Sequence, residues 1–318
     1  MTENAIVWSY ANAWEPIARM QPDQPAALQG DRVLSWGAFD AEADALAARL
    51  IEAGLQHNSK VGIYLHNCAE YLTANYAAFK AGLAPFNVNY RYTADELLYL
   101  FDNADAEAIV FHAGFAERVD EIRARLPQVK CWIAVEEPGF SAPPWAENYE
   151  RVVANIPANR PTLAPWGRSN DDLLILYTGG TTGLPKGVMW RQEDQIGVTG
   201  AGGSPLLGIP PLSRPEEAVE RVPLMPRRIA LVACPLMHGT GLFSALMTLL
   251  AGGAVALLPS RHFDATQLWN EVAHHRVTSL AIVGLPFAQP MLEALERNPG
   301  RWDLSCVTSI GSSGAMWS

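Results

Sequence analysis

Residues 172–187 read DLLILYTGGTTGLPKG, an apolar run followed at once by a glycine-rich loop. The run from Asp172 to Tyr177 is typical of a strand buried in a sheet. Four glycines and three threonines follow, and the backbone N–H groups of such a loop can turn inward around an anion. The threonine hydroxyls and the ammonium of Lys186 add further donors. The stretch therefore predicts a polyphosphate-binding loop after a buried strand.

The position of the lysine separates this loop from the Walker A type. A Walker A loop has its lysine directly after the second glycine, whereas Leu184 and Pro185 come between Gly183 and Lys186. Because Lys186 lies between a proline and a glycine, we expect it on a flexible turn. A glycine-rich turn without a ligand is the alternative, and the length of the string argues against it.

Outward from this stretch, helical and strand patterns alternate, which is typical of largely parallel sheets covered by helices. Helices are expected at residues 40–53, 70–81, 93–101, 115–126, 242–250, 265–274 and 287–297. Strands are expected at residues 61–65, 85–88, 108–111, 131–135, 229–234, 255–258, 280–283 and 307–310. The alternation predicts an α/β fold of two doubly wound subdomains, with the ligand at the carboxyl ends of the strands.

Two proline-rich stretches interrupt the alternation. Residues 136–170 contain six prolines and no sustained period, as expected of a connector that crosses the surface. Residues 197–226 are expected to form a mobile surface loop without regular structure. We place the boundary in the first stretch, so that residues 1–165 form one α/β subdomain. Residues 166–318 then carry the phosphate loop and a second, incomplete α/β subdomain.

The composition excludes several classes of protein. A chain of 318 residues is long enough for about two domains. With 49% hydrophobic and 18% charged residues, it should fold rather than stay disordered. The formal net charge is −10, and Arg227 with Arg228 is the largest basic cluster, so no nucleic-acid partner is expected. The longest apolar stretch, residues 246–258, is too short for a membrane span, so no transmembrane segment is expected.

The cysteines and the first residues indicate a compartment. Cys68, Cys131, Cys234 and Cys306 lie far apart and lack the CxxC spacing of metal or redox sites, which is typical of reduced thiols. The first residues lack the basic and then apolar segments of a signal peptide. We therefore expect a cytoplasmic protein.

The glycine-rich loop resembles that of the adenylate-forming superfamily, which comprises acyl-CoA synthetases, luciferases and adenylation domains. The superfamily's loop reads roughly Tyr-Thr-Ser-Gly-Thr-Thr-Gly-x-Pro-Lys-Gly, and residues 177–187 read YTGGTTGLPKG. Gly179 replaces the usual serine, which removes one hydroxyl donor and leaves the backbone cradle. Residues 34–36 and 80–91 are similar to two motifs of the superfamily's first half. The resemblance covers almost the whole chain.

Two later segments also match. Residues 235–241, PLMHGTG, are similar to a Pro-Leu-x-His-x-x-Gly motif whose histidine, here His238, lies near the acyl pocket in relatives. A capping or packing role is the alternative for this histidine. Residues 309–318, SIGSSGAMWS, resemble a segment whose loop contacts the adenylate. In that segment Ser313, Gly314 and Ala315 match, whereas Met316 and Trp317 depart from the superfamily's Pro-Leu.

The resemblance implies the N-terminal domain of this superfamily, in which the two sheets exchange segments and some early strands pair with late ones. The superfamily's pattern continues further, with a glutamate that helps hold Mg²⁺, an aspartate that binds ribose, and a C-terminal domain with a catalytic lysine. These motifs do not occur in the chain. We therefore expect the N-terminal portion of a longer synthetase, with a truncated second subdomain, no C-terminal domain and no activity by itself. Its exposed strand edge would favour homo-oligomers.

The implied activity is that of an ATP-dependent, AMP-forming acid:CoA ligase. The carboxylate attacks the α-phosphate of ATP to give an acyl adenylate and pyrophosphate, and the thiol of CoA then displaces AMP. Lys186 and Thr178 are the implied catalytic residues: Lys186 holds the β- and γ-phosphates, and Thr178 helps coordinate Mg²⁺. The implied ATP-binding residues are Thr178, Gly179, Gly180, Thr181, Thr182, Gly183, Lys186, Ser313, Gly314 and Ala315. His238 is the implied acyl-binding residue.

The substrate and the acceptor stay open. Apolar segments around residues 242–249 and 282–286 suggest a hydrophobic carboxylic acid such as a long-chain fatty acid, and a plain core would give the same pattern. Residues 188–191 and the insertion at 197–226 resemble long-chain or steroid side-chain CoA ligases of lipid metabolism. The alternatives are a non-catalytic nucleotide- or acyl-binding fragment and an adenylation domain that loads a carrier protein. Peripheral membrane attachment is disfavoured by the net charge of −10.

Overall fold

The computed structural model describes residues 6–156, 164–179, 183–203 and 208–315, and the account below concerns these residues. The strands are β1 (Pro25–Gln29), β2 (Arg32–Ser35), β3 (Lys60–Tyr64), β4 (Ala84–Asn87), β5 (Ala106–His112), β6 (Cys131–Val135), β7 (Glu147–Asn148), β8 (Leu173–Thr178), β9 (Lys186–Arg191), β10 (Ile229–Val232), β11 (Ala254–Leu257), β12 (Ser279–Ile282) and β13 (Ser309–Ser312). The α-helices are α1 (Tyr10–Met20), α2 (Trp36–Glu52), α3 (Ala69–Lys80), α4 (Ala94–Asn103), α5 (Ala116–Arg123), α6 (Tyr149–Ala154), α7 (Gln192–Val198), α8 (Ala218–Arg221), α9 (Gly239–Leu250), α10 (Ala265–His275) and α11 (Leu285–Arg297). Short 3-10 helices are η1 (Ala113–Phe115), η3 (Pro215–Glu217) and η4 (Val222–Leu224).

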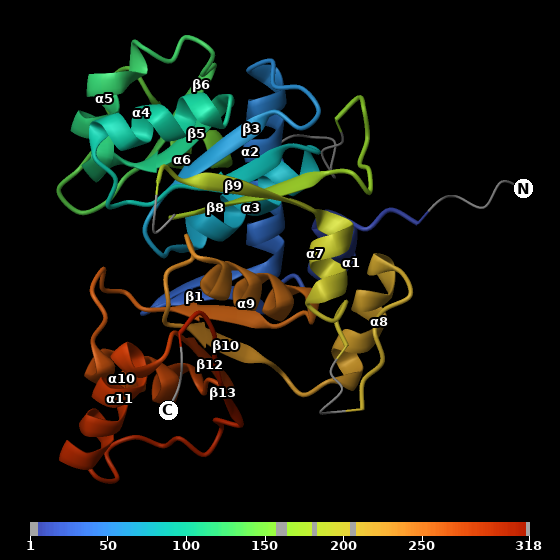
Figure 1. Ribbon diagram of the computed structural model, residues 1–318. Coiled ribbons are helices and arrows are strands. Elements are labelled where there is room, and N and C mark those ends of the chain that lie inside the picture. Colours follow the sequence, from blue (N-terminus) through green and yellow to red (C-terminus); the bar gives the residue numbers. More distant parts are fainter. Residues whose placement is uncertain (1–5, 157–163, 180–182, 204–207, 316–318) are drawn as a thin grey trace, which may run out of the picture.

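Two mostly parallel sheets form the frame of the protein, one above the other in Figure 1. The upper, seven-stranded sheet has the order β7-β6-β5-β3-β4-β8-β9, and the lower, six-stranded sheet has the order β13-β12-β10-β11-β1-β2. Within the described residues, β2 and β9 are the strands that pair antiparallel with a neighbour. The predicted α/β fold with two sheets is confirmed.

Each sheet combines strands that are far apart in the sequence. β1 pairs in parallel with β11, with Ala27 opposite Val255, and β8 joins the upper sheet through β4. The expected pairing of early with late strands is therefore present. Because each sheet takes strands from both sides of residue 165, the predicted boundary at that residue does not separate the sheets, and the division into domains stays a prediction.

Local signals account for the ends of several helices. Thr93 and Glu96 form a capping box at the start of α4, with each side chain bonded to the other residue's backbone N–H. α2 begins at Trp36, four residues before its predicted start, because the Ser35 side chain accepts a hydrogen bond from the Ala38 N–H. Gly54, with a φ of 86°, follows the end of α2, as the glycine signal predicts.

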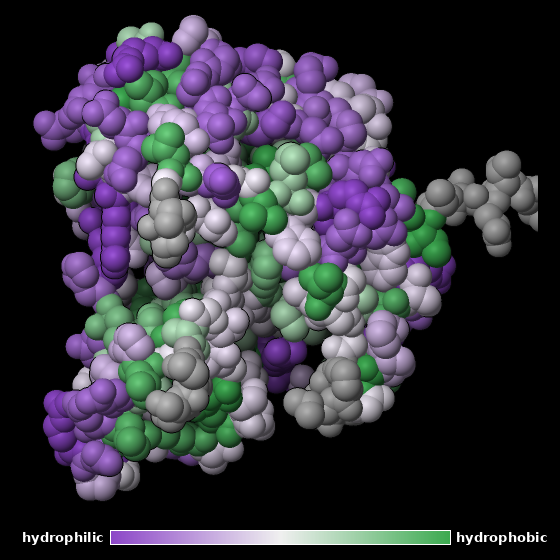
Figure 2. Space-filling model, in the orientation of Figure 1, coloured by the Kyte–Doolittle hydropathy of each residue, from purple (hydrophilic) through white to green (hydrophobic). Residues whose placement is uncertain are grey.

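The helices between the sheets join them into one unit. α3 packs against β3 and β4 of the upper sheet and against β1 of the lower sheet. A single cluster of buried apolar side chains includes Ile63 of the upper sheet and Val255 of the lower sheet. Figure 2 shows that the visible face is hollowed between the upper and lower halves, with hydrophobic residues along the hollow.

A buried ionic network also lies among these helices. The Lys80 ammonium, fully buried, contacts carboxylate oxygens of Glu15 at 3.2 Å, Asp40 at 2.7 Å and Asp44 at 2.8 Å. Arg168 also pairs with Glu15. A buried ammonium needs such partners, since an unpaired charge in a protein interior costs several kcal/mol. The network therefore ties α1, α2 and α3 to the segment that leads into β8.

The structure corrects two readings of the proline-rich stretches. Residues 197–226 are not wholly irregular, because α7 reaches Val198 and η3, α8 and η4 follow one another from Pro215 to Leu224. Pro215 stands in the first turn of η3, where a missing N–H costs nothing, so this proline starts a helix instead of breaking one. The connector at 136–170 contains β7 and α6, which are too short to give a periodic pattern.

Besides the short elements of the two proline-rich stretches, the sequence did not predict α1, α7, β1, β2 and β9. In the part of the chain that the structure describes, no helix is both long and apolar enough to cross a membrane.

Candidate active site

The ends of the phosphate loop are held by two paired strands. Thr178, the last residue of β8, lies opposite Lys186, the first residue of β9, and Tyr177 lies opposite Gly187. Lys186 therefore belongs to a strand, and its expected place on a flexible turn was wrong. The reason is the short antiparallel return of the chain, which the Pro-Lys-Gly sequence conceals. Of the predicted loop residues, Gly180, Thr181 and Thr182 lie outside the described residues, so their roles stay predictions.

Gly187 has a steric reason to be glycine. A Cβ atom at this position would lie 2.9 Å from the Tyr177 ring and 3.0 Å from the Ile175 side chain. The Tyr177 ring thus lies over the return strand, and its hydroxyl donates a hydrogen bond of 2.8 Å to Asn103 Oδ1. The packing and the hydrogen bond of the Tyr177 ring therefore also fix β8, the strand from which the phosphate loop departs.

The two groups named as catalytic are accessible at this hairpin. Thr178 and Lys186 are both exposed, as are Gly179 and Gly183. No carboxylate of the described residues is within ion-pair distance of the Lys186 ammonium, so its charge is available to an anion. The exposed hydroxyl of Thr178 is an oxygen donor of the kind that Mg²⁺ prefers.

His238 begins the helix that faces this hairpin. It is the N-cap residue of α9, and its side chain makes no capping hydrogen bond. The capping alternative therefore does not explain the imidazole. The pKa of His238 lies below its ordinary value because the ring is partly buried and Arg91 is positively charged nearby. The imidazole is thus neutral near pH 7.

The start of α9 lies against both other predicted segments. A Cβ on Gly239 would lie 3.0 Å from Leu176 Cδ2 in β8. A Cβ on Gly314, whose φ is 82°, would lie 3.3 Å from Thr240 Oγ1. Gly314 stands with Ser313 and Ala315 in the exposed loop after β13. The structure therefore brings the β8–β9 hairpin, the loop of residues 233–238 (the His238 loop) and residues 313–315 together at the carboxyl ends of the strands.

Two asparagines of the upper sheet fix the His238 loop. Asn67, which follows β3, accepts a hydrogen bond of 2.7 Å from the Leu236 N–H and donates one of 3.0 Å to the Cys234 carbonyl. Asn87, at the end of β4, donates a hydrogen bond of 2.6 Å to the Met237 carbonyl. Sequence reasoning missed both asparagines, because the loop that they hold is 150 to 169 residues away and no motif singles out either residue.

A basic cleft of about 500 Å³ lies beside this loop, between the two sheets. Its lining includes His66, Tyr90, Arg91, Arg261, His262 and Phe287. Arg261 pairs with Glu137, so the loop after β11 is joined to the loop after β6. Of these residues, only Tyr90 and Arg91 lie in a segment that the sequence singled out. His66, Arg261 and His262 come from loops without a recognisable motif, and Phe287 lies in the first turn of α11.

His66 lines the basic cleft, and His112 lies behind it, with ring centroids 5.4 Å apart and ring planes tilted by 40°. The His66 N–H donates a hydrogen bond of 3.1 Å to His112 Nδ1. Burial and the charge of Arg261 lower the pKa of His66 to about 4. Burial and the charges of His66 and Arg261 lower the pKa of His112 to about 3. Both imidazoles are therefore neutral near pH 7, and the guanidinium groups supply the positive charge of the cleft.

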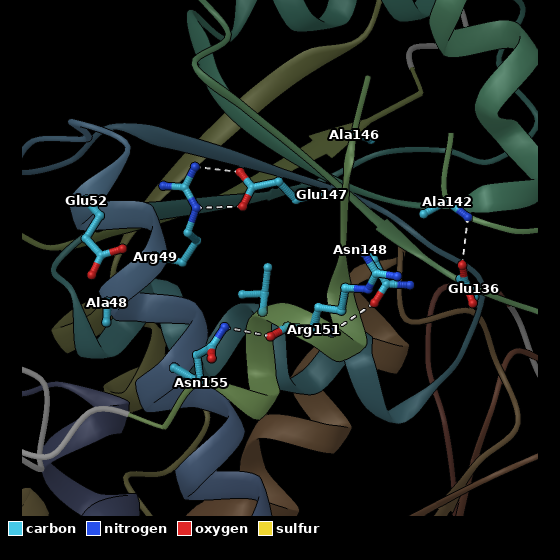
Figure 3. Close-up of a pocket in the computed structure, with 12 residues that line it drawn as sticks. Ala48, Arg49, Glu52, Glu136, Ala142, Ala146, Glu147, Asn148, Arg151 and Asn155 are labelled. Carbon is cyan, nitrogen blue, oxygen red and sulfur yellow. Dashed lines mark hydrogen bonds and ion pairs between the residues drawn. The ribbon is translucent and has the colours of Figure 1, made fainter. Parts of the chain in front are cut away.

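A second cavity, of about 420 Å³, lies between α2 and α6 (Figure 3). Arg49 and Glu147 form a two-bonded ion pair in it, with N–O distances of 2.7 and 2.5 Å. This cavity is at the β7 edge of the upper sheet, whereas the phosphate loop is at the β8–β9 edge. It is thus separate from the candidate site. The described ranges contain no group of three His, Cys, Asp or Glu residues placed to hold a metal ion.

Comparison with known proteins gives relatives along the whole chain. A medium-chain acyl-CoA ligase, Mig, from Mycobacterium avium is 33% identical over 332 residues, which cover 99% of this chain and 59% of that protein. A 3-oxocholest-4-en-26-oate–CoA ligase from Rhodococcus rhodochrous is 36% identical over 315 residues, which cover 97% of this chain and 56% of the relative. The chain thus spans less than two thirds of the length of these relatives.

Solved structures share the fold. The inhibitor-bound N-terminal domain of FACL13 from Mycobacterium tuberculosis matches with a TM-score of 0.75 at 21% identity, covering 98% of this chain and 71% of that one. An anthranilate CoA ligase, AuaEII, in complex with anthranoyl-AMP, matches with a TM-score of 0.79 at 17% identity, covering 98% of this chain and 56% of that one. At these identities the likeness shows the fold alone.

A family described as AMP-binding enzyme matches residues 14–316. This match and the acyl-CoA ligase relatives confirm the resemblance to the N-terminal portion of adenylate-forming enzymes. By these matches, the chain belongs to the AMP-binding enzyme family.

Proposed function

We propose that this chain is the ATP-binding part of an AMP-forming acid:CoA ligase. The observation that carries the proposal is the hairpin in which Thr178 and Lys186 lie opposite each other at the carboxyl end of β8. The hairpin presents a glycine-rich backbone and the Lys186 ammonium, which contacts no carboxylate among the described residues, to the same side as the His238 loop. Such a place suits a polyphosphate whose α-phosphate is attacked by a bound carboxylate.

Within this proposal, Lys186 binds the β- and γ-phosphates and the leaving pyrophosphate. The loop residues Gly179 and Gly183 supply backbone N–H groups, and Ser313, Gly314 and Ala315 contact the nucleotide from the other side. The Thr178 hydroxyl is the group we propose for Mg²⁺. The metal ion, bound with ATP, would neutralise part of the charge on the phosphates.

The proposed acid is hydrophobic, such as a medium- or long-chain fatty acid or a steroid acid. Relatives with such substrates in their names support this choice. Trp190 of β9 and Phe243 of α9 meet edge to face, with ring centroids 6.1 Å apart, and offer an apolar surface between the hairpin and α9. A neutral His238 at the start of α9 fits an acyl chain better than a charged group would.

The proposed acceptor is CoA, and the basic cleft supports it. Arg91 and Arg261 lie in the cleft together with the aromatic side chains of Tyr90 and Phe287. Guanidinium groups bind phosphates, and aromatic faces stack on bases, so the cleft suits the phosphate-bearing nucleotide end of CoA. A carrier-protein acceptor is the alternative, and the cleft's size and charge favour the small anionic molecule.

Three further features complete the proposal. The 318-residue chain by itself is proposed to bind ATP without completing the reaction, because it spans 59% or less of the curated relatives compared above. We also propose that the protein acts in the cytoplasm. Its exposed edge strand β13, with the half-exposed Ile310, supports self-association.

The test combines calorimetry with exchange. ATP binding is measured on the 318-residue chain, and carboxylate-dependent exchange of pyrophosphate into ATP is measured on the natural full-length protein. Binding by the chain together with exchange stimulated by hydrophobic acids supports the proposal. Absence of both overturns it, and binding of an acid alone would favour the non-catalytic alternative.

A further inference from the structure

Asn87 makes an unusual set of contacts for a side chain at the end of a strand. It is only 5% exposed. Its Oδ1 accepts a hydrogen bond of 2.6 Å from the Tyr177 N–H, and its Nδ2 donates one of 2.9 Å to the Tyr177 carbonyl. The same Nδ2 donates a second hydrogen bond, of 2.6 Å, to the Met237 carbonyl.

The bonds to Tyr177 replace a missing part of the sheet. The backbone pairing of β4 with β8 consists of one registered pair, Phe86 with Ile175. Two residues further along β8, the Asn87 amide offers one donor and one acceptor to Tyr177, as the peptide group of a neighbouring strand would. The end of β8, from which the phosphate loop departs, is therefore held by a side chain.

The bond to Met237 couples this point to the second loop. Both N–H groups and the oxygen of one planar amide are used, so a shift of Tyr177 relative to Met237 must break a hydrogen bond. Because the site is buried, water cannot replace the lost partner without cost. Thr178 follows Tyr177, and His238 follows Met237. The amide thus fixes the distance between the two loops that carry these residues.

We propose that Asn87 is a positioning residue that holds the phosphate loop and the His238 loop in one geometry. It touches neither proposed substrate. Its catalytic consequence rests on the proposed function, in which ATP lies on the first loop and the acid beside the second. Attack of the carboxylate on the α-phosphate requires those two anions to meet at a set distance, and a misplacement of about 1 Å can cost about 100-fold in rate.

Asn67 provides a matched control on the same loop. Its amide bonds Cys234 and Leu236, and no hydrogen bond joins it to β8 among the described residues. Asn67→Ala therefore loosens the His238 loop while the hold on Tyr177 persists. Asn87→Asp provides a control for volume, because a carboxylate has nearly the size of the amide but cannot donate to the two carbonyls.

The first arm measures amide hydrogen exchange on the 318-residue chain. Asn87→Ala and Asn87→Asp are expected to raise exchange by about ten-fold or more at residues 177–178 and 186–187 and, at the same time, at 237–240. Asn67→Ala is expected to raise exchange only at 234–240. Unchanged exchange at residues 177–178 and 186–187 in the folded Asn87→Asp variant overturns the proposal, whether or not the chain binds ATP.

The second arm measures acid-dependent pyrophosphate exchange in the natural full-length protein. Asn87→Asp is expected to lower kcat by about ten-fold or more with a smaller change in the KM for ATP. The reason is that both loops still form, while the distance between the phosphate loop and the His238 loop is no longer fixed. Equal kcat in an active wild type and in Asn87→Asp overturns the catalytic part. An inactive wild type overturns the proposed function instead, and the exchange pattern of the first arm still decides whether Asn87 joins the loops.

Discussion

Lys186 lies directly opposite Thr178 across the antiparallel pair of β8 and β9. The strand register therefore closes the phosphate loop at its base, so the ammonium and the hydroxyl are held on the same short hairpin before any ligand arrives. Part of the entropy cost of ordering a glycine-rich loop around an anion is thus met by the fold itself.

Lys186→Ala should lower the rate of acid-dependent pyrophosphate exchange in the natural full-length protein. Loss of one preorganised charged donor at a developing anion typically costs about 100-fold in kcat. The control is Lys130→Ala, which removes an exposed lysine paired with Glu107 at the amino ends of β5 and β6, whereas the hairpin lies at the carboxyl end of β8. An exchange rate for Lys186→Ala equal to that of the control would rule out a role for this ammonium in the reaction.

Gly187→Ala should destabilise the chain. The added methyl group would press on the Tyr177 ring and the Ile175 side chain at about 3 Å, and overpacking of this kind costs about 1–3 kcal/mol. Urea unfolding at a fixed temperature measures the change. Gly197→Ala is the matched control, because a Cβ there meets no atom within 4 Å and alanine favours the helix α7. Equal free energies of unfolding for the two variants would contradict the packing at Gly187.

Much of the regular α/β pattern could be predicted from the sequence because many of its elements carry a local signal. The strand at Cys131–Val135 is a bounded apolar run, and α4 has its capping box at Thr93. β9 escaped prediction because five of its six residues are exposed, so its sequence shows no buried face. Its position follows from pairing with β8, which is a tertiary contact.

The residues of the candidate site also fall into two groups, those that a local sequence signal marks and those that only the folded chain brings together. Thr178, Lys186, His238 and Gly314 lie in short motifs, and the structure places the segments that carry them next to one another. Asn67, His66 and Arg261 have no such motif, since their positions depend on loops from different strands that meet only in the folded chain. Asn87 could have been suspected from its place at the carboxyl end of β4, but its partners are 90 and 150 residues away.

His112 should make the protein less stable in acid. Its pKa is lowered to about 3 in the fold, against about 6.5 in the unfolded chain, so the unfolded state binds a proton first as the pH falls. This contribution is absent above about pH 6.5 and grows as the pH falls toward 3. Between pH 7 and pH 5 we expect a loss of about 2 kcal/mol in the free energy of unfolding from this residue.

The measurement is urea unfolding of the wild type and of His112→Asn at both pH values. The asparagine oxygen can still accept the His66 N–H, while the variant has no group that titrates there. The variant should therefore lose less stability on acidification than the wild type. An identical loss in both proteins would show that His112 takes up its proton in the folded chain as easily as in the unfolded one.

Arg91→Gln should separate the two half-reactions of the proposed enzyme. Arg91 lines the basic cleft, and its charge lowers the pKa of His238, so it stands between the proposed CoA site and the acyl site. Loss of a guanidinium that binds phosphate should raise the KM for CoA by about ten-fold, because a charge-assisted hydrogen bond contributes about 1.5–3 kcal/mol. Pyrophosphate exchange, which does not involve CoA, should change less than the KM for CoA.

Arg123→Gln, on the surface of α5, controls for the loss of one positive charge. If Arg91→Gln slowed exchange and left the KM for CoA unchanged, the basic cleft would belong to the adenylation step, and the acceptor would have to be sought elsewhere on the protein.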